Sequence, residues 1–296
     1  MSDVSAIEWT DSTWNVTTGC TRVSPGCANC YIERTPPFRI SGRRFERVGN
    51  EETTGLVLHP ERLKKVPRGP RIFVNSLSDL FHEEIPDDFI AQTFDTMRLH
   101  PDRTFQVLTK RPERALDLVP KIYDYAGEWE INDPDRDGIP LPNVWLGVSI
   151  ENARYTWRAD VLREIPAAVR FISAEPLLGS LFDAGRTVQS ERAHAAGVAE
   201  GGDRPRSPNN ATGPLDLTGI DWLIVGGESG PGARPMHPDW ARELRDQCLY
   251  GTDLDASRPA FFFKQWGGKT AKAGGRELDG RTWDEMPTAT ADRASA

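Results

Sequence analysis

The stretch Asn143–Glu151 (NVWLGVSIE) holds seven consecutive residues without a charge, Val144–Ile150, and ends on a glutamate. An uncharged run of this length is typical of a strand that is buried on both faces, as strands of parallel sheets are. Shorter apolar runs with polar or glycine-bearing ends recur along the chain, at Ile72–Val74, Phe105–Leu108, Phe171–Ile172, Leu223–Val225 and Phe261–Phe263. The pattern predicts a sheet of buried parallel strands.

Helix signals separate these runs. Pro86, Pro112 and Pro238 stand where helices would begin, and acidic residues follow in each first turn, where a negative charge suits the helix dipole. Apolar residues then recur at helical spacing. Strands that alternate with helices form βαβ units. We therefore predict an α/β fold with a parallel sheet, open or closed into a barrel.

The domain organisation follows from length and composition. A chain of 296 residues can form one barrel-like domain. We predict a single domain over residues 1–270, with insertions at about 124–142 and about 183–219, because both stretches are rich in Gly, Pro, Asp and Arg. Residues 271–296 are expected to be a weakly ordered tail.

Charge and apolar content narrow the function classes. The chain has 36 Lys and Arg against 44 Asp and Glu, a net charge of -8. Such a surface does not attract a polyanion in bulk, so a nucleic-acid contact would need a local basic patch. No run of eighteen apolar residues and no signal-peptide pattern is present, so we expect a cytoplasmic protein without a membrane partner. In a reducing compartment, four cysteines favour metal binding or redox chemistry over disulfides.

Three of the four cysteines lie within eleven residues. Cys20, Cys27 and Cys30 form C-x6-C-x2-C, and the Pro25-Gly26 turn can fold the loop so that all three thiols converge. Three ligands suit an iron–sulfur cubane with one open iron, whereas structural zinc needs four. Cys248 is the obvious fourth candidate, but its apolar helix face favours a buried core thiol. A zinc knuckle completed by a distant ligand is the alternative.

Polar residues follow the predicted strands, at the end where barrels carry their sites. Glu175 and Glu228 each stand directly after an apolar run, where a carboxylate is costly unless it is paired. Lys110 and Lys264 are their candidate partners. These four residues are the predicted catalytic group.

The sequence also resembles known families. The phrases TWNVTTGCTRVSPGCANCY, FVNSLSDLFHEEIP, VLTKRPERA, GVSIEN, FISAEPLL and GGESGPGARP, within about Trp9 to Gly268, are similar to a phage-associated uncharacterised three-cysteine family found beside three-Cys-motif partner proteins. The cysteine motif followed by an aromatic residue, Tyr31, and a βα-repeat chain resembles the radical S-adenosylmethionine (SAM) superfamily. The first spacing departs from the usual C-x3-C, and Gly226-Gly227-Glu228 comes too late to match the superfamily's GGE by position.

The superfamily resemblance implies a fold, cofactors and contacts. The implied fold is α/β, a partial or full TIM-type (βα) barrel of parallel strands with an N-terminal iron–sulfur cluster loop. It implies a [4Fe-4S] cluster on the three cysteines, whose open iron chelates the methionine part of SAM, and an external electron donor. The residues that we expect around SAM follow the cluster motif and the strands, and they are Tyr31, Asn75, Ser76, Asp79, Glu151 and Asn152. Glu175 and Glu228 would then face the substrate.

Two functions are carried forward from the sequence. The first is an iron–sulfur enzyme that cleaves SAM reductively to modify or repair a substrate. A nucleobase is one candidate, since Arg43-Arg44, Lys64-Lys65 and Arg68 supply a local basic face. The second is a non-enzymatic, zinc- or cluster-stabilised module of phage origin that binds nucleic acid or a protein, such as a three-Cys-motif partner.

Overall fold

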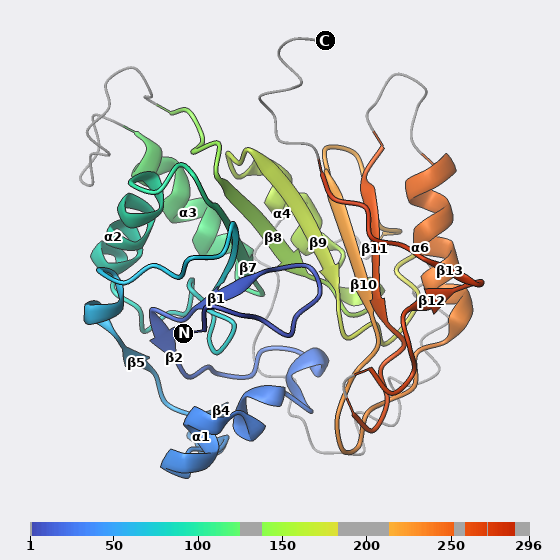
Figure 1. The fold of residues 1–296 in the computed structure, drawn as a ribbon, viewed down its shortest axis with the longest axis horizontal. Coiled ribbons are helices and arrows are strands. Elements are labelled where there is room, and N and C mark those ends of the chain that lie inside the picture. The colour runs from blue at the N-terminus through green and yellow to red at the C-terminus, as the bar shows by residue number, and fades with distance from the viewer. Residues whose placement is uncertain (1, 125–137, 183–212, 252–257, 271, 288–296) are drawn as a thin grey trace.

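The computed structural model describes residues 2–124, 138–182, 213–251, 258–270 and 272–287. Its centre is a seven-stranded parallel sheet that curls into a half-barrel (Figure 1). Each strand pairs with the strand before it in the sheet, so the spatial order equals the chain order. The strands are β1 (Ser12–Trp14), β6 (Arg71–Val74), β7 (Thr104–Thr109), β8 (Val144–Ser149), β9 (Val169–Ala174), β10 (Trp222–Gly226) and β11 (Ala260–Gln265).

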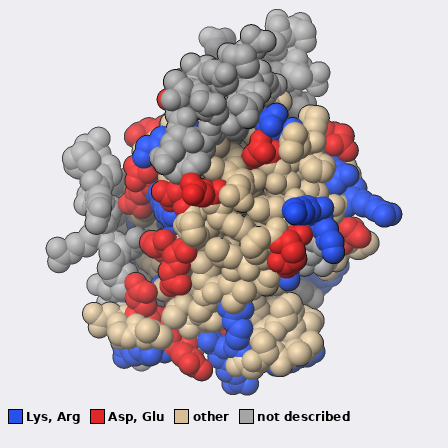
Figure 2. Space-filling view, turned by 90° about the vertical axis from the view of Figure 1, so that its left-hand side faces the viewer, with Lys and Arg blue, Asp and Glu red and all other residues tan. Residues whose placement is uncertain are grey.

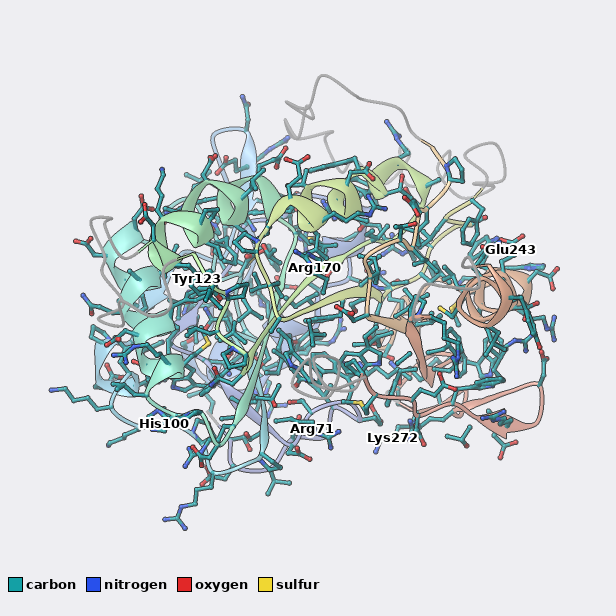
Figure 3. All side chains as sticks on the ribbon, turned by 90° about the horizontal axis from the view of Figure 1, so that it is seen from above. Arg71, His100, Tyr123, Arg170, Glu243 and Lys272 are labelled. Atoms are coloured by element: carbon teal, nitrogen blue, oxygen red, sulfur yellow. The ribbon has the colours of Figure 1, made fainter. Side chains whose placement is uncertain are left out.

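Helices cover one side of this sheet. They are α2 (Asp87–Arg98), α3 (Pro112–Tyr123), α4 (Trp157–Glu164) and α6 (Pro238–Tyr250). Seen from above, they form an arc from α2, near His100, to α6, which carries Glu243 (Figure 3). Two of them begin on a proline, and Pro86 caps α2, as the sequence predicted. The α/β class and the parallel strands are therefore confirmed.

The two faces of the sheet bury different side chains. The face toward the helices is mostly aliphatic and includes Val74, Val107 and Val225. The opposite, concave face carries an aromatic cluster at the amino-terminal ends of the strands, in which Trp222 lies edge-on to Trp145 and to Phe262 at ring-centroid distances of 5.9 and 6.0 Å. A buried polar residue, Gln106, lies among these rings and donates Nε2 to the Trp9 carbonyl at 3.2 Å.

The chain between β1 and β6 forms smaller elements. A short strand β2 (Thr17–Thr18) pairs with β5 (Val57–Leu58), and β3 (Glu46–Val48) pairs with β4 (Glu51–Thr53). Helix α1 spans Pro36–Ser41, and it lies at the lower edge of Figure 1. Four short 3-10 turns, η1 (Pro25–Cys27), η2 (Tyr31–Arg34), η3 (Pro60–Arg62) and, after β8, η5 (Ala153–Tyr155), complete the described elements.

Part of the predicted tail is folded, which corrects the expectation of weak order there. Within residues 272–287, β12 (Glu277–Leu278) pairs with β13 (Arg281–Thr282). Leu278 is fully buried, and the Trp283 ring lies edge-on to Phe261 at 5.7 Å. Two apolar side chains thus dock this hairpin on the core. Most of both predicted insertions, 125–137 and 183–212, lies outside the described residues, as do residue 271 and residues 288–296.

An ion pair ties the edge strand β1 to β6. The Asp11 carboxylate accepts hydrogen bonds from Arg71 Nε at 2.8 Å, from Nη2 at 3.0 Å and from the backbone N–H at 3.1 Å. These hydrogen bonds and the Arg71 charge hold the pKa of Asp11 below its ordinary 3.8. A carboxyl group whose pKa is lowered by folding stabilises the fold above its unfolded pKa.

The contribution of Asp11 should therefore be complete above about pH 4 and disappear as the pH falls through the folded pKa. We expect the free energy of unfolding to fall more steeply between about pH 4 and pH 2.5 in the parent than in Asp11→Asn. Urea titrations at several pH values measure both slopes. Equal slopes would show that this pair does not couple folding to protonation.

No helix of the described residues is both long enough and apolar enough to span a membrane.

Candidate functional site

The cysteine segment crosses the carboxyl-terminal ends of the sheet strands. It leaves β1 through Asn15, whose Oδ1 accepts a hydrogen bond from the Leu77 N–H at 2.8 Å, just beyond β6. Gly19 then donates its N–H to the Leu77 carbonyl at 3.0 Å. Further along, Gly26 and Asn29 contact side chains that follow β8 and β10. Residues 15–31 are thus fixed on the edge of the sheet where parallel βα proteins carry their sites.

Two residues that were predicted to contact SAM hold this segment in place. Asn75, whose φ is 58°, accepts the Thr17 N–H on Oδ1 at 3.1 Å and donates Nδ2 to Thr17 Oγ1 at 3.0 Å. Ser76 donates its hydroxyl to Asn15 Oδ1 at 3.2 Å. Asn75 is 2% exposed, and both the oxygen and the nitrogen of its side-chain amide are hydrogen-bonded. Its described role is to dock the segment rather than to face a ligand.

All three cysteines of the motif are free thiols and partly buried. Cys20 and Cys30 pack against an apolar cluster of Ile32, Phe38 and Leu77. Burial raises the pKa of Cys20 to about 12 and that of Cys30 to about 11, although Arg111 opposes the rise at Cys20. Binding a metal would therefore have to displace these protons, as thiolate ligation always does.

Arg111 and Asp79 form a buried ion pair beside Cys20. Arg111 Nη1 lies 3.3 Å from Asp79 Oδ2 and 4.0 Å from Cys20 Sγ, and Nη2 donates to the Thr21 carbonyl at 3.2 Å. Asp79 also accepts from Thr109 Oγ1 at 2.7 Å and from the Lys110 N–H at 2.9 Å. Burial would raise the pKa of Asp79, but Arg111 and the other donors hold it below its ordinary value.

Asp79 was also predicted to contact SAM. A fourth donor, the Phe81 N–H at 3.0 Å, completes its set, so both carboxylate oxygens are occupied by the protein itself. Next to Cys20, a positive charge comes from Arg111.

Glu228 holds the turn that carries Cys27 and Cys30. Its Oε2 accepts hydrogen bonds from Asn29 Nδ2, from Arg234 Nε and from the Arg234 N–H, each at 2.9 Å, and Arg234 Nη2 bonds its Oε1. Arg234 Nη2 also donates to the Pro25 carbonyl at 3.0 Å. These donors hold the pKa of Glu228 below its ordinary value, against the effect of burial. Glu228 therefore anchors the cysteine turn, and it was predicted to face a substrate.

Glu151 is a second buried anchor. Its Oε1 accepts the Gly26 N–H at 3.2 Å, and its Oε2 pairs with Arg158 Nη1 at 3.2 Å. A Cβ on Gly26 would stand 3.3 Å from the Glu151 carboxyl carbon and 3.6 Å from Lys110 Cε, so the turn lies directly over both side chains. Asn152, the neighbouring SAM candidate, caps η5 by accepting the Arg154 N–H at 3.0 Å.

Glu175 and Lys264 face each other across the ends of β9 and β11. Lys264 Nζ lies 2.6 Å from Glu175 Oε1, and the two side chains keep 15% and 18% of their surface exposed. Gly226, on the intervening strand β10, would bring a Cβ within 3.1 Å of the Glu175 carboxyl carbon. These two charges are therefore less enclosed than Glu151 and Glu228, which are 1% and 6% exposed.

Tyr31 bridges the cysteine turn and the end of β6. Its hydroxyl donates to the Ser76 carbonyl, while 46% of the residue surface is exposed. Burial of the hydroxyl raises its pKa, and the nearby Cys30 and Glu175 act in the same direction. Cys30 and Glu175 are therefore close enough to Tyr31 for their charges to affect its pKa.

The predicted residues thus gather at one edge of the sheet but divide into two groups. Asn75, Asp79, Glu151, Asn152 and Glu228 are engaged in holding loops. Glu175, Lys264, Lys110 and Tyr31 remain partly accessible around the thiols. Sequence reasoning missed the residues that pair with the anchors, Arg111, Arg158, Arg234 and Asn29. A signal for three of them was available, because Asn29, Arg111 and Arg234 lie in the quoted phrases TWNVTTGCTRVSPGCANCY, VLTKRPERA and GGESGPGARP.

Among the described residues, no group of three or more His, Cys, Asp and Glu side chains is placed to hold a metal ion.

The comparisons with known proteins add a family. No curated protein and no solved structure matches the chain. One family, described as "Protein of unknown function (DUF5131)", matches residues 4–287, which takes in every strand of the sheet, the cysteine segment and both buried anchors. The chain therefore belongs to the DUF5131 family.

Proposed function

We propose that Cys20, Cys27 and Cys30 bind a [4Fe-4S] cluster, and that the chain is a cytoplasmic enzyme of the radical SAM type. The observation that carries the proposal is the docking of three free thiols on the carboxyl-terminal edge of a curled parallel sheet. The finer fold that we propose is a partial TIM-type barrel with the cysteine loop at its mouth.

The surroundings of the thiols fit a thiolate cluster. Such a cluster carries net negative charge, and Arg111 supplies a guanidinium 4.0 Å from Cys20 Sγ. Lys110 and Arg22 act in the same sense on Cys30. The apolar contacts of Cys20 and Cys30 with Phe38 and its neighbours limit the access of water. When bound, the cluster would supply an open iron and the electron for reductive cleavage of SAM.

The chain's own residues would position what binds next to the thiols. Glu151 and Glu228 fix the cysteine turn through Gly26 and Asn29, so the metal would sit at one defined place on the edge of the sheet. Glu175 and Lys264 offer a partly exposed carboxylate and ammonium. They can accept from and donate to polar groups of a substrate, and a nucleobase offers both kinds of group. An external electron donor and a three-Cys-motif protein remain proposed partners.

Anaerobic reconstitution with iron and sulfide, followed by SAM and dithionite, tests the reaction class. We expect a brown protein with about four irons and formation of 5′-deoxyadenosine without added substrate. A boiled sample and a sample without dithionite are the controls. A colourless protein that holds about one zinc and forms no 5′-deoxyadenosine would contradict the proposal and favour the non-enzymatic binding module.

A further inference from the structure

Two serines lie side by side on the concave face of the sheet. Ser149 on β8 pairs in register with Ser173 on β9. Their strand neighbours Val148 and Ile172 belong to the aliphatic side, and side chains alternate along a strand, so both serines point to the concave face. Neighbouring strands lie about 4.8 Å apart, so one small molecule can contact both hydroxyls. We call this pair the serine layer.

Both serines are buried, yet neither hydroxyl has a hydrogen-bond partner within the described part of the chain. Ser149 is 3% exposed and Ser173 is 2% exposed. Fully enclosed polar atoms without a partner do occur among the described residues, for example Ser12 Oγ and Gln106 Oε1, but the two hydroxyls are not among them. Water can therefore still reach each hydroxyl. Buried polar side chains are almost always hydrogen-bonded, so an unpartnered pair on one face points to a bound molecule.

The serine layer lies between an aromatic floor and a charged rim. Two residues inward on the same strands, the Phe171 ring lies so close to Gly147 that a Cβ there would stand 2.5 Å from three ring atoms. Two residues outward on β9, Glu175 pairs with Lys264 at 2.6 Å. A ligand on the concave face would thus meet an apolar ring at its inner end, hydroxyls in its middle and charges at its outer end.

This arrangement selects an uncharged, flat group. Each hydroxyl can donate and accept, which suits the neighbouring N–H and C=O groups on the edge of a nucleobase. The Lys110 side chain extends toward the cysteine segment, since its Cε lies 3.6 Å from a Cβ built on Gly26. A phosphate or carboxylate in the serine layer would therefore lose its hydration without gaining a cation. The Phe171 ring supplies an apolar contact for a heterocycle.

We propose that Ser149 and Ser173 bind the edge of a nucleobase, which enters the concave face from the carboxyl-terminal edge of the sheet and meets Glu175 and Lys264 with its outer part. That this base is the substrate rests on the proposed function, whereas its binding does not need the cluster. On β8, the serine layer lies two residues inside Glu151, which was predicted to contact SAM. The layer is therefore assigned to the base of the substrate and not to the adenine of SAM.

The base could belong to a free nucleoside or to a nucleic acid, and the surface favours the nucleoside. A nucleic acid needs closely spaced cations for its phosphates. The chain carries a net charge of -8, and on the face that Figure 2 shows, acidic and basic side chains are mixed around uncharged surface. That face therefore offers no basic track to a polymer.

Binding to the metal-free protein tests the site without the cluster. Thymidine, cytidine and guanosine are the probes, followed by titration calorimetry, and SAM is titrated separately. We expect at least one of these nucleosides to bind the parent. The variant Ser149→Ala/Ser173→Ala should bind it at least about tenfold more weakly, because two hydrogen bonds to the base are lost.

Ser12→Ala is the matched control. It also removes a buried, unpartnered hydroxyl, but Ser12 pairs in register with Ile72 on the aliphatic side of the sheet. This control should bind the nucleoside like the parent. The parent and both variants should have thermal unfolding midpoints within about 2 °C of one another, because none of these substitutions removes a hydrogen bond within the described protein.

Two isosteric substitutions separate the effect of the hydroxyl from that of the space around it. Ser173→Thr and Ser173→Val add the same bulk, but only the threonine keeps a hydroxyl. The threonine variant should therefore bind the nucleoside at least about threefold more tightly than the valine variant. Equal binding by these two variants would show that the Ser173 hydroxyl does not contact the ligand.

The remaining outcomes separate the site from the proposed function. Failure of all three nucleosides to bind, or loss of SAM binding alone in Ser149→Ala/Ser173→Ala, would overturn the site. Tighter binding of a single-stranded oligonucleotide than of the nucleoside would overturn the assignment to a free nucleoside. If the nucleoside binds as expected but the reconstituted parent forms no 5′-deoxyadenosine, the proposed function fails and the binding site stands.

Discussion

Replacing any one of Cys20, Cys27 and Cys30 with alanine is expected to abolish iron incorporation. A cluster with an open iron uses all three thiolates, and loss of one leaves two ligands on an assembly that needs three. The three residues lie in one segment that is anchored at Gly26 and Asn29, so no described cysteine is placed to substitute for the missing one. Iron and acid-labile sulfide, measured after anaerobic reconstitution, should fall to background.

Cys248→Ala is the matched control. Cys248 is fully buried within the core on α6, and burial raises the pKa of its thiol. Its replacement should leave iron and sulfide at the parental level and lower the free energy of unfolding by about 1–2 kcal/mol through lost packing. Loss of iron in Cys248→Ala, or its full retention in one of the three motif variants, would refute the three-ligand site.

Arg111→Met should lower the free energy of unfolding by about 3–5 kcal/mol. Arg111 is 6% exposed, and its loss would leave the Asp79 carboxylate buried without its charge partner. Glu83, the other acidic neighbour, is 68% exposed and can be solvated by water, so the cost comes mainly from Asp79. Chemical denaturation followed by circular dichroism gives the difference.

A second substitution tests this cause. Asp79→Asn in the Arg111→Met background removes the uncompensated charge, so the double variant should recover part of the lost stability. Arg98→Met, which breaks a surface pair with Asp95 on α2, should change stability by no more than about 0.5 kcal/mol. If the double variant is less stable than Arg111→Met, the buried charge is not the cause.

Much of the fold could be predicted from the sequence because its strands are buried on both faces. A run such as Val144–Ile150 can be recognised as a buried strand from its own residues alone. Prolines mark where helices begin. β1 was missed because Ser12–Trp14 is short and carries a single apolar residue. The terminal hairpin was missed because Leu278 and Trp283 stand apart among polar residues, and only their contacts with the core show that they are buried.

The position of the candidate site could be predicted from the sequence, but its ion pairs could not. A carboxylate that directly follows a buried strand is expected to form an ion pair. Glu151, Glu175 and Glu228 each form one. Which cation pairs with which carboxylate depends on how the loops cross, and no local pattern encodes that. Glu175 and Lys264 paired as expected, whereas Glu228 is held by Arg234, six residues later. The anchoring role of Glu228 thus followed from tertiary contacts alone.

The anchoring of the cysteine turn has a consequence for the order of events during synthesis. Because strand order equals chain order, the sheet can grow from β1 to β11 as the polypeptide leaves the ribosome, each new strand adding to the last. The cysteines emerge first, yet Asn29 meets Glu228 across 199 positions, and Pro25 meets Arg234 across 209. The thiols therefore lack these anchors until the chain has been made beyond Arg234. Under the proposed function, metal delivered before that point would reach a loop without these contacts, so a supply of metal after translation suits this architecture.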